Sequence, residues 1–322
     1  APAFAENGIA ISKDGVAISY SVYGEGETTL VFVHGWSCNS SIWQNQVPYF
    51  AKDYRVVTLD LAGHGTSGTI REIYTLMAFG EDVAAVVKAI KAHQVILIGH
   101  SMAGAVIIET AGMIPDDIAA LVGIDTMQDF EEEFTPEQIT EFIAPFKEDF
   151  REATDSFVRE MFIESTPPEL VEKVVGMMTK ASAKVGISAL EEMMKTSYVA
   201  HPPKIKAPVW CLNSNLWPTK PKVNSKYVPE FNLHVMQDVG HFPGPETMFL
   251  SHVSPWSTTP LPQAAEQSES VDDVQYFGQH PSVAPHCVIS EVEHVALQLS
   301  ALPISWFRVH ALPSSHAVTQ EP

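Results

Sequence analysis

The chain has 322 residues, of which 45% are hydrophobic and 18% are charged, and its formal net charge is −20. This length and composition are typical of a globular protein with one large domain and an insertion, or with two domains. The charge argues against nucleic-acid backbones and anionic membranes as partners because Coulomb repulsion opposes both, and no apolar run reaches the ~18–20 residues of a membrane span.

The first part of the chain alternates strand and helix patterns. We predict strands at residues 16–22, 29–34 and 55–59, because each is rich in β-branched or aromatic residues and is bounded by turn residues. Thr75 is expected to cap a helix that runs to about Lys91, with valines repeating on one face. Strands that alternate with helices indicate a mostly parallel sheet.

A serine motif follows the next predicted strand, and it reads Gly99-His100-Ser101-Met102-Ala103-Gly104. A β-branched run precedes it, and small and apolar residues follow at helical spacing. This pattern is typical of a nucleophile elbow, in which a strained turn presents a serine between a strand and a helix. The usual form is G-x-S-x-G. Ala103 takes the last position here, with Gly104 directly behind it.

Three further strands are predicted at residues 120–125, 208–212 and 231–236. Between the first two the pattern is helical. Thr135-Pro136-Glu137 is a helix start signal, and phenylalanine and methionine recur at helical spacing after it. We interpret residues 126–200 as a helical cap over a cleft, and residues 1–125 and 201–250 as the core of the protein.

The last part of the chain, residues 251–322, is a tail rich in proline, serine and histidine whose structure the sequence does not predict. The three cysteines, Cys38, Cys211 and Cys287, cannot all pair, and neither they nor the histidines have metal-ligand spacing. We therefore expect no metal site, and we expect Cys211, in a predicted strand, to be a buried free thiol.

Four motifs in order resemble the α/β-hydrolase superfamily, and the likeness runs from about residue 16 to residue 249. They are His34-Gly35-Trp36, the loop from Asp60 to Ser67, the Ser101 motif, and Gly240-His241-Phe242. The chain is most similar to esterase-type members with a helical cap. The resemblance implies an α/β fold with a mostly parallel central sheet, flanking helices and a helical cap insertion.

The resemblance also implies the roles of four residues. Ser101 takes the place of the nucleophile, and His241 that of its general base, because it follows both the nucleophile and the acid in chain order. The backbone amides of Trp36 and Met102 take the place of the oxyanion hole. Histidines 34, 64 and 100 are expected to shape hydrogen bonds around the site. No metal or organic cofactor is implied.

The acid of the triad departs from the family pattern. The family usually has an aspartate on the loop after the strand at 208–212, but that loop begins Asn213-Ser214-Asn215. Two interpretations remain. The acid is Asp125, at the end of the neighbouring strand, or Asn215 replaces the aspartate and the triad is impaired, since an amide cannot neutralise an imidazolium. Order and location favour Asp125, although a carboxylate that caps the next helix would give the same pattern.

The expected function is hydrolysis of small-molecule carboxylic esters by a two-step acyl-enzyme mechanism. A serine nucleophile argues against dehalogenase and epoxide-hydrolase chemistry, which use an aspartate in this superfamily. A lactonase, an amidase or peptidase, or a C–C hydrolase would use the same residues, and a homologue with an impaired triad would bind a ligand without turnover. A structural or interaction protein has little support.

The oligomeric state and the cellular location are not predicted. The chain begins Ala1-Pro2-Ala3 without a methionine, which is compatible with a processed secreted or periplasmic protein and with a trimmed cytoplasmic one.

Overall fold

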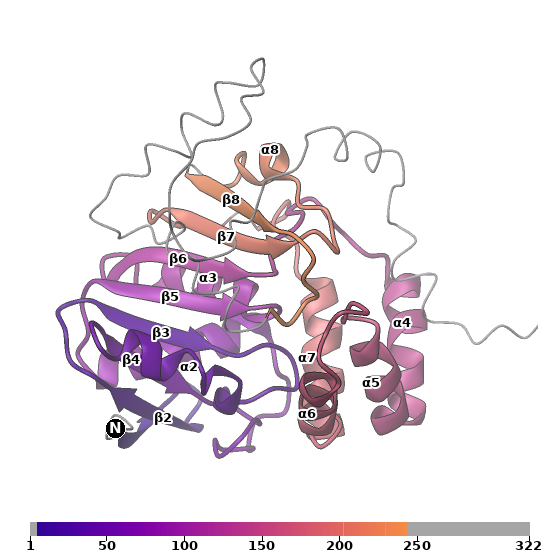
Figure 1. Cartoon of the computed structure of the whole chain (residues 1–322), viewed down its shortest axis with the longest axis horizontal. Coiled ribbons are helices and arrows are strands. Elements are labelled where there is room, and N and C mark those ends of the chain that lie inside the picture. Colours follow the sequence, from indigo (N-terminus) through magenta and orange to yellow (C-terminus); the bar gives the residue numbers. More distant parts are fainter. Residues whose placement is uncertain (1–4, 202, 229, 244–322) are drawn as a thin grey trace, which may run out of the picture. The chain divides into compact units, whose positions relative to one another are not determined.

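The protein is built around an eight-stranded sheet (Figure 1). The computed structural model describes residues 5–201, 203–228 and 230–243. The strand order is β1-β2-β4-β3-β5-β6-β7-β8; β1 and β2 pair antiparallel, and β3 to β8 run parallel to one another. The strands are β1 (Glu6–Ile11), β2 (Ala17–Tyr23), β3 (Thr29–Val33), β4 (Arg55–Leu59), β5 (Val95–His100), β6 (Ile118–Ile124), β7 (Val209–Ser214) and β8 (Phe231–Met236).

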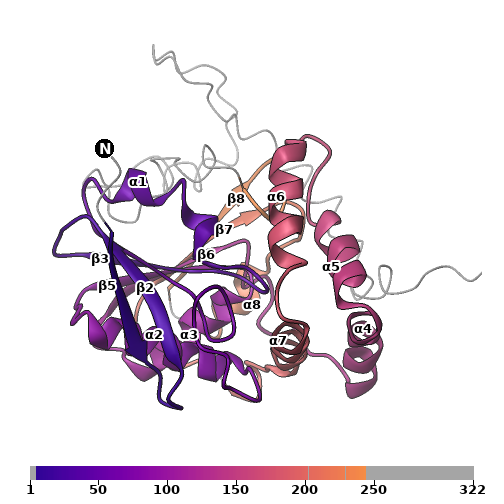
Figure 2. The same cartoon turned by 90° about the horizontal axis from the view of Figure 1, so that it is seen from below.

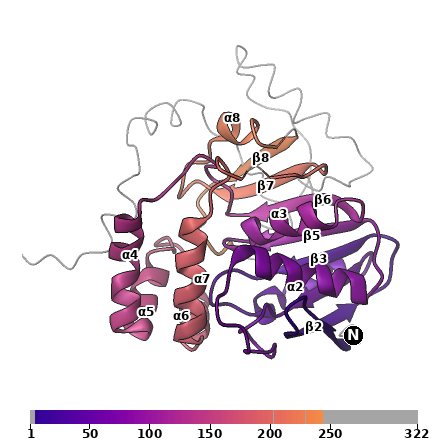
Figure 3. The same ribbon diagram turned by 180° about the vertical axis from the view of Figure 1, so that it is seen from behind.

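Helices cover both faces of the sheet. Figure 3 shows α2 (Leu76–Ala89) and α3 (Ala103–Met113) on one face, and Figure 2 shows α1 (Val47–Phe50) on the other, preceded by the short turn η1 (Ser40–Trp43). A short helix, α8 (Pro221–Asn224), lies between β7 and β8 in sequence. Every residue of β3 and β5 is buried. Strands covered on both faces read as continuous apolar runs, which explains the composition of these two.

A four-helix insertion separates β6 from β7 in the chain. Its helices are α4 (Pro136–Glu148), α5 (Phe150–Arg159), α6 (Pro168–Met178) and α7 (Ala183–Lys195). They gather beside the carboxyl ends of the parallel strands (Figure 1). The predicted start signal is a capping box, in which the Thr135 hydroxyl and the Gln138 side chain each satisfy the other residue's backbone amide.

The predicted strands all occur, and two of them, β4 and β8, have the predicted bounds. The N-cap Thr75 is also confirmed, since its side chain accepts a hydrogen bond from the Ala78 amide. Four short elements were not predicted: β1, η1, α1 and α8. In β1 the usual burial of large apolar side chains is reversed, because Ile9 and Ile11 face solvent while the small Ala10 is buried. An edge strand whose large side chains point outward gives no amphipathic signal.

Cys38 and Cys211 are buried free thiols, as expected for Cys211. Cys287 and the tail at 251–322 lie outside the described residues. In the described ranges, no helix combines the length and the apolar character needed to cross a membrane. The same residues contain no group of three or more His, Cys, Asp or Glu side chains placed to hold a metal ion.

Candidate active site

Ser101 occupies the sharp turn between β5 and α3. Its backbone φ is +56°, in the left-handed region that a non-glycine residue adopts only under constraint. Its amide donates to the Ile124 carbonyl at 3.0 Å, which ties the turn to the end of β6. Gly99 is required for this geometry, since a Cβ there would lie 2.5 Å from the Ala103 carbonyl oxygen. Ala103, in the fifth position of the motif, is fully buried.

The loop after β3 lies against this turn. A Cβ added to Gly35 would lie 3.1 Å from the Cβ of Ser101, so the next amide, that of Trp36, is near the serine. Met102 directly follows Ser101 and is the N-cap of α3. Among the described residues, neither the Trp36 amide nor the Met102 amide donates a hydrogen bond. Two open backbone donors beside a serine are what an oxyanion hole requires.

His241 and Asp125 form a buried pair. The distance from His241 Nδ1 to Asp125 Oδ2 is 2.5 Å, and the two residues are 4% and 1% exposed. Because a carboxylate only accepts, Nδ1 carries the proton and Nε2 is the basic nitrogen. The other carboxylate oxygen, Oδ1, accepts from the Ser214 amide at 2.7 Å.

The pKa of the Asp125 carboxyl is lower than usual. Burial by itself raises this pKa, but the hydrogen bond and charge of His241 and the hydrogen bonds from Ser214 outweigh it. Asp125 also has a left-handed backbone, with φ +45°. A strained residue with a stabilised charge is typical of a functional site.

The His241 loop is held from several sides. Its amide donates to the Met161 carbonyl at 2.9 Å, between α5 and α6, and its carbonyl lies 2.8 Å from His100 Nε2. The rings of His100 and Trp217 lie 4.7 and 4.8 Å from the imidazole, centroid to centroid. Since His100 directly precedes Ser101, this ring contact brings the histidine loop to the serine turn.

Asn215 lies elsewhere. Its side chain is exposed and donates to Gln237 Oε1 at 3.1 Å. In the part of the chain that the structure describes, no hydrogen bond joins Asn215 to His241. The structure therefore brings Asp125, and not Asn215, against the imidazole.

The other three motif histidines are buried and make backbone hydrogen bonds. His34 accepts from the Leu61 amide through Nε2, and His64 Nδ1 lies 3.0 Å from the Ala62 carbonyl. Burial lowers the pKa of all three, to about 3 for His64 and His100. These rings are therefore neutral, and they shape the loops around the site.

Several contacts at the site had no signal in the sequence. The Trp36 indole donates to the Gly186 carbonyl in α7 at 2.7 Å and packs edge-on against three phenylalanines of the insertion. Asn213 and Thr126 pair beside Asp125. The only signal in the sequence was that both polar residues lie at the ends of predicted strands. They are 87 residues apart, so the sequence did not show that they pair.

A model of the family described as "alpha/beta hydrolase fold" matches residues 28–199, which is more than half of the chain. The chain belongs to this family. The predicted fold class, a mostly parallel sheet flanked by helices with an inserted helical segment, is confirmed.

This α/β hydrolase is similar to proteins of several activities. It is 33% identical over 115 residues to a bifunctional esterase/perhydrolase of Acinetobacter calcoaceticus, which covers 35% of this chain and 42% of that protein. The chain thus matches less than half the length of that relative. It is 25% identical over 238 residues to a 3-oxoadipate enol-lactonase of Acinetobacter baylyi, covering 71% of this chain and 86% of that one.

Among solved structures, this α/β hydrolase resembles a thermophilic esterase from Thermogutta terrifontis. The TM-score is 0.65 at 22% identity, over 76% of this chain and 94% of the other. At this identity the likeness concerns the fold.

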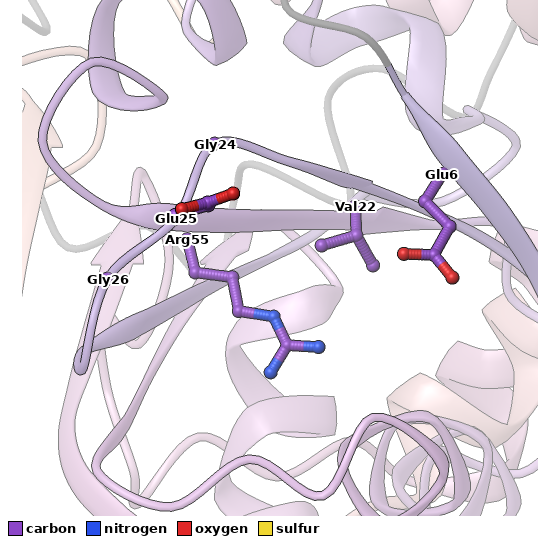
Figure 4. A pocket seen from close by; sticks show the side chains of 6 residues that line it. All are labelled: Glu6, Val22, Gly24, Glu25, Gly26 and Arg55. Atoms are coloured by element: carbon purple, nitrogen blue, oxygen red, sulfur yellow. The ribbon is translucent and has the colours of Figure 1, made fainter.

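One surface pocket of this α/β hydrolase, of about 410 Å³, lies away from the site (Figure 4). Arg55 begins β4, so the pocket is at the amino ends of the parallel strands, whereas Ser101 follows the carboxyl end of β5. The Arg55 guanidinium donates to the Ile90 carbonyl at 3.2 Å. The pocket is lined by Glu6, Val22, Gly24, Glu25, Gly26 and Arg55.

Proposed function

We propose that this protein is a serine hydrolase that cleaves small-molecule carboxylic esters through an acyl-enzyme. Ser101 is the nucleophile, His241 the general base and acid, and Asp125 the carboxylate that orients the imidazole. The observation that carries the proposal is the 2.5 Å hydrogen bond between His241 Nδ1 and Asp125 Oδ2. This hydrogen bond occupies Nδ1 and leaves Nε2 as the base. The His241 ring also contacts His100, the residue before Ser101.

In the first step, Ser101 Oγ attacks the ester carbonyl carbon as its proton passes to His241 Nε2. The amides of Trp36 and Met102 stabilise the oxyanion. The bond to the alcohol then breaks, and the alcohol takes the proton from Nε2. In the second step, water attacks the acyl carbon by the same route, and the carboxylic acid leaves as the serine hydroxyl is restored.

We further propose that residues 126–200 act as a cap on the core at 1–125 and 201–250. The support is twofold: α4 to α7 are inserted between β6 and β7, and they contact both catalytic loops. The Trp36 indole reaches Gly186, and the His241 amide reaches Met161. A cap at this position would shape the pocket for the acyl or alcohol group.

The test is hydrolysis of p-nitrophenyl acetate and butyrate by the full chain and three variants. Ser101→Ala should abolish turnover and labelling by a fluorophosphonate probe. Asp125→Asn should lower kcat by up to about 10⁴-fold, the loss that this change causes in a serine-protease triad. Asn215→Asp is the matched control and should leave kcat unchanged. An unlabelled, inactive wild-type chain would instead indicate a binding protein.

A second candidate is lactone hydrolysis, because the enol-lactonase relative aligns with 71% of this chain. A lactone is a cyclic ester, so the same residues would act and the alcohol would stay attached to the acyl group. Comparing kcat/KM for γ- and δ-lactones with that for open-chain esters distinguishes the two.

A further inference from the structure

Two turns with a strained backbone meet at the site. We call the turn at Ser101 the nucleophile corner and the turn at Asp125 the acid corner. Ser101 follows β5 with φ +56°, and Asp125 follows β6 with φ +45°. The two strands are parallel neighbours, so their carboxyl ends lie side by side. Left-handed backbone at a serine and at an aspartate costs free energy, and it persists only where surrounding contacts hold it.

Thr126, the residue after Asp125, contacts the nucleophile corner directly. Its hydroxyl donates to the Ser101 carbonyl oxygen at 2.7 Å. Gly104 makes the contact possible, because a Cβ at that position would collide with the Thr126 side chain. The glycine that follows the serine motif is therefore explained by its fit to Thr126.

Asn213 holds the same residue from the opposite side. Its Oδ1 accepts from the Thr126 amide at 3.1 Å, and its Nδ2 donates to the Thr126 carbonyl at 2.8 Å. Nδ2 also donates to Thr219 Oγ1 at 2.8 Å, and the asparagine is fully buried. A side-chain amide that pairs with both backbone groups of one residue fixes that peptide segment in place.

We infer that Thr126 is a positioning residue, anchored by Asn213, that holds the nucleophile corner and the acid corner in one arrangement. This inference rests on the proposed function, because it assigns the two corners to catalysis. The inference also explains the roles of the last two residues of β7. Where the family usually has its acid in the next loop, this chain has Asn213 and Ser214, which bind Thr126 and the Asp125 carboxylate respectively.

The test compares Thr126→Val, Thr126→Ser and Thr110→Val in the full chain. Valine removes the hydroxyl at nearly constant shape, and serine keeps it. Thr110 is the matched control, because it is a buried threonine on α3 whose hydroxyl donates to the Val106 carbonyl at 2.9 Å, away from the corners. Asn213→Asp is a second variant, since an acceptor replaces the donor that faces the Thr126 carbonyl.

For p-nitrophenyl ester hydrolysis, we expect Thr126→Val and Asn213→Asp to lower kcat by about 10- to 100-fold, since small misplacements have effects of this size. KM should change less than about three-fold, because the loss is in the transition state. Thr126→Ser and Thr110→Val should stay within about three-fold of the wild type in kcat. A Thr126→Val enzyme with wild-type kcat, or a Thr126→Ser enzyme that loses as much, would overturn the inference.

Amide hydrogen exchange gives a readout that does not need turnover. Thr126→Val should speed exchange in peptides covering both 99–105 and 124–128, and Thr110→Val should not. If both corners exchange faster while the wild-type chain hydrolyses no ester, the coupling stands and the proposed function fails. If exchange is unchanged while the wild type is active, the proposed function stands and the coupling is refuted.

Discussion

At the scale of single residues, the site depends on buried polar groups that remain neutral. His100 is the clearest case, because it directly precedes Ser101 and its ring contacts His241. Its Nε2 lies 2.8 Å from the His241 carbonyl, and only a protonated Nε2 can donate to it. Burial, together with the neighbouring imidazole, lowers its pKa to about 3. It therefore holds the histidine loop without adding a charge that would compete with an imidazolium.

The first prediction concerns this hydrogen bond. His100→Leu should lower kcat roughly five-fold, because the buried His241 carbonyl loses a bond worth about 1 kcal/mol. His100→Gln should recover most of the rate, since its terminal amide can donate from nearly the same place. Steady-state kinetics on a p-nitrophenyl ester measure both. Equal losses in the two variants would show that ring packing, and not the hydrogen bond, matters.

At the scale of elements, the helical insertion is joined to the Trp36 loop and to the His241 loop. α7 accepts the Trp36 indole through Gly186, and the segment between α5 and α6 accepts the His241 amide through Met161. Gly240 is needed at the second contact, because a Cβ there would lie 2.7 Å from the Met161 carbonyl oxygen. Moving the insertion would therefore disturb both the Trp36 loop and the His241 loop.

The second prediction tests the Trp36 contact. Trp36→Phe removes the indole donor but keeps an aromatic ring, so we expect a free energy of unfolding lower by about 1 kcal/mol, and a lower kcat. Trp43→Phe is the control, because Trp43 is equally buried and its indole nitrogen has no hydrogen-bond partner among the described residues. Urea denaturation and ester kinetics give the two values. A Trp43→Phe enzyme with an equal loss of kcat would contradict the role of the indole.

At the scale of the whole molecule, an ion-pair network joins the first hairpin, the loop after β4 and α2; its Arg71 and Asp82 are buried and its Asp14 is exposed. Arg71 Nη2 lies 2.6 Å from Asp82 Oδ1, and Arg71 Nε lies 2.7 Å from Asp14 Oδ2. Asp82 also accepts from the Ser12 hydroxyl and the Ala62 amide. Its carboxylate is fully buried, and burial raises its pKa although these partners stabilise the charge.

The third prediction follows from this network. Arg71→Met should lower the free energy of unfolding by about 3 kcal/mol or more, because it leaves the Asp82 charge buried without its main partner. Lys13→Met is the control, since Lys13 pairs with Glu81 at the surface, with its side chain 79% exposed. Exposed pairs add little, and we expect no measurable change from it. Equal effects of both substitutions in urea denaturation would refute this reading of the network.

The fourth prediction concerns stability and pH. Burial lowers the pKa of His64 and His100 to about 3, against an ordinary value of 6.5. At pH 7.5 both are neutral in the folded and unfolded states. As the pH falls below 6.5, the unfolded chain binds protons that the folded chain does not, so stability falls. Together the two histidines should lower the free energy of unfolding by about 3 kcal/mol between pH 7.5 and pH 5.5.

Urea denaturation at pH 7.5, 6.5 and 5.5 measures this slope. Glu109 and Glu132 act in the opposite direction, because burial raises their pKa above 4.5 and the folded chain binds their protons more tightly. His34, whose pKa burial also lowers, adds to the fall, and His64→Gln should reduce the fall by about 1.4 kcal/mol. Stability that does not fall between pH 7.5 and 5.5 would show that these rings are not held neutral.

The sequence by itself determined the repeating elements, the serine turn and the late histidine motif. Strand and helix periodicity, the Thr75 and Thr135 caps, and the glycines around Ser101 are local signals, and they act through neighbours within a few residues. These signals were enough to predict most strands of the sheet and the presence of the helical insertion. They failed at β1, whose large side chains face solvent.

Only the tertiary structure decided which side chain lies against His241. Asp125 and Asn215 were both compatible with the chain order, and the pair that formed is 116 residues apart. The alignment of β5, β6 and β7 places the Asp125 carboxylate beside the imidazole and turns Asn215 outward to Gln237. The same alignment brings Thr126 to Ser101 and Asn213. Contacts between strand ends depend on the packing of whole strands, and a one-dimensional pattern does not carry that information.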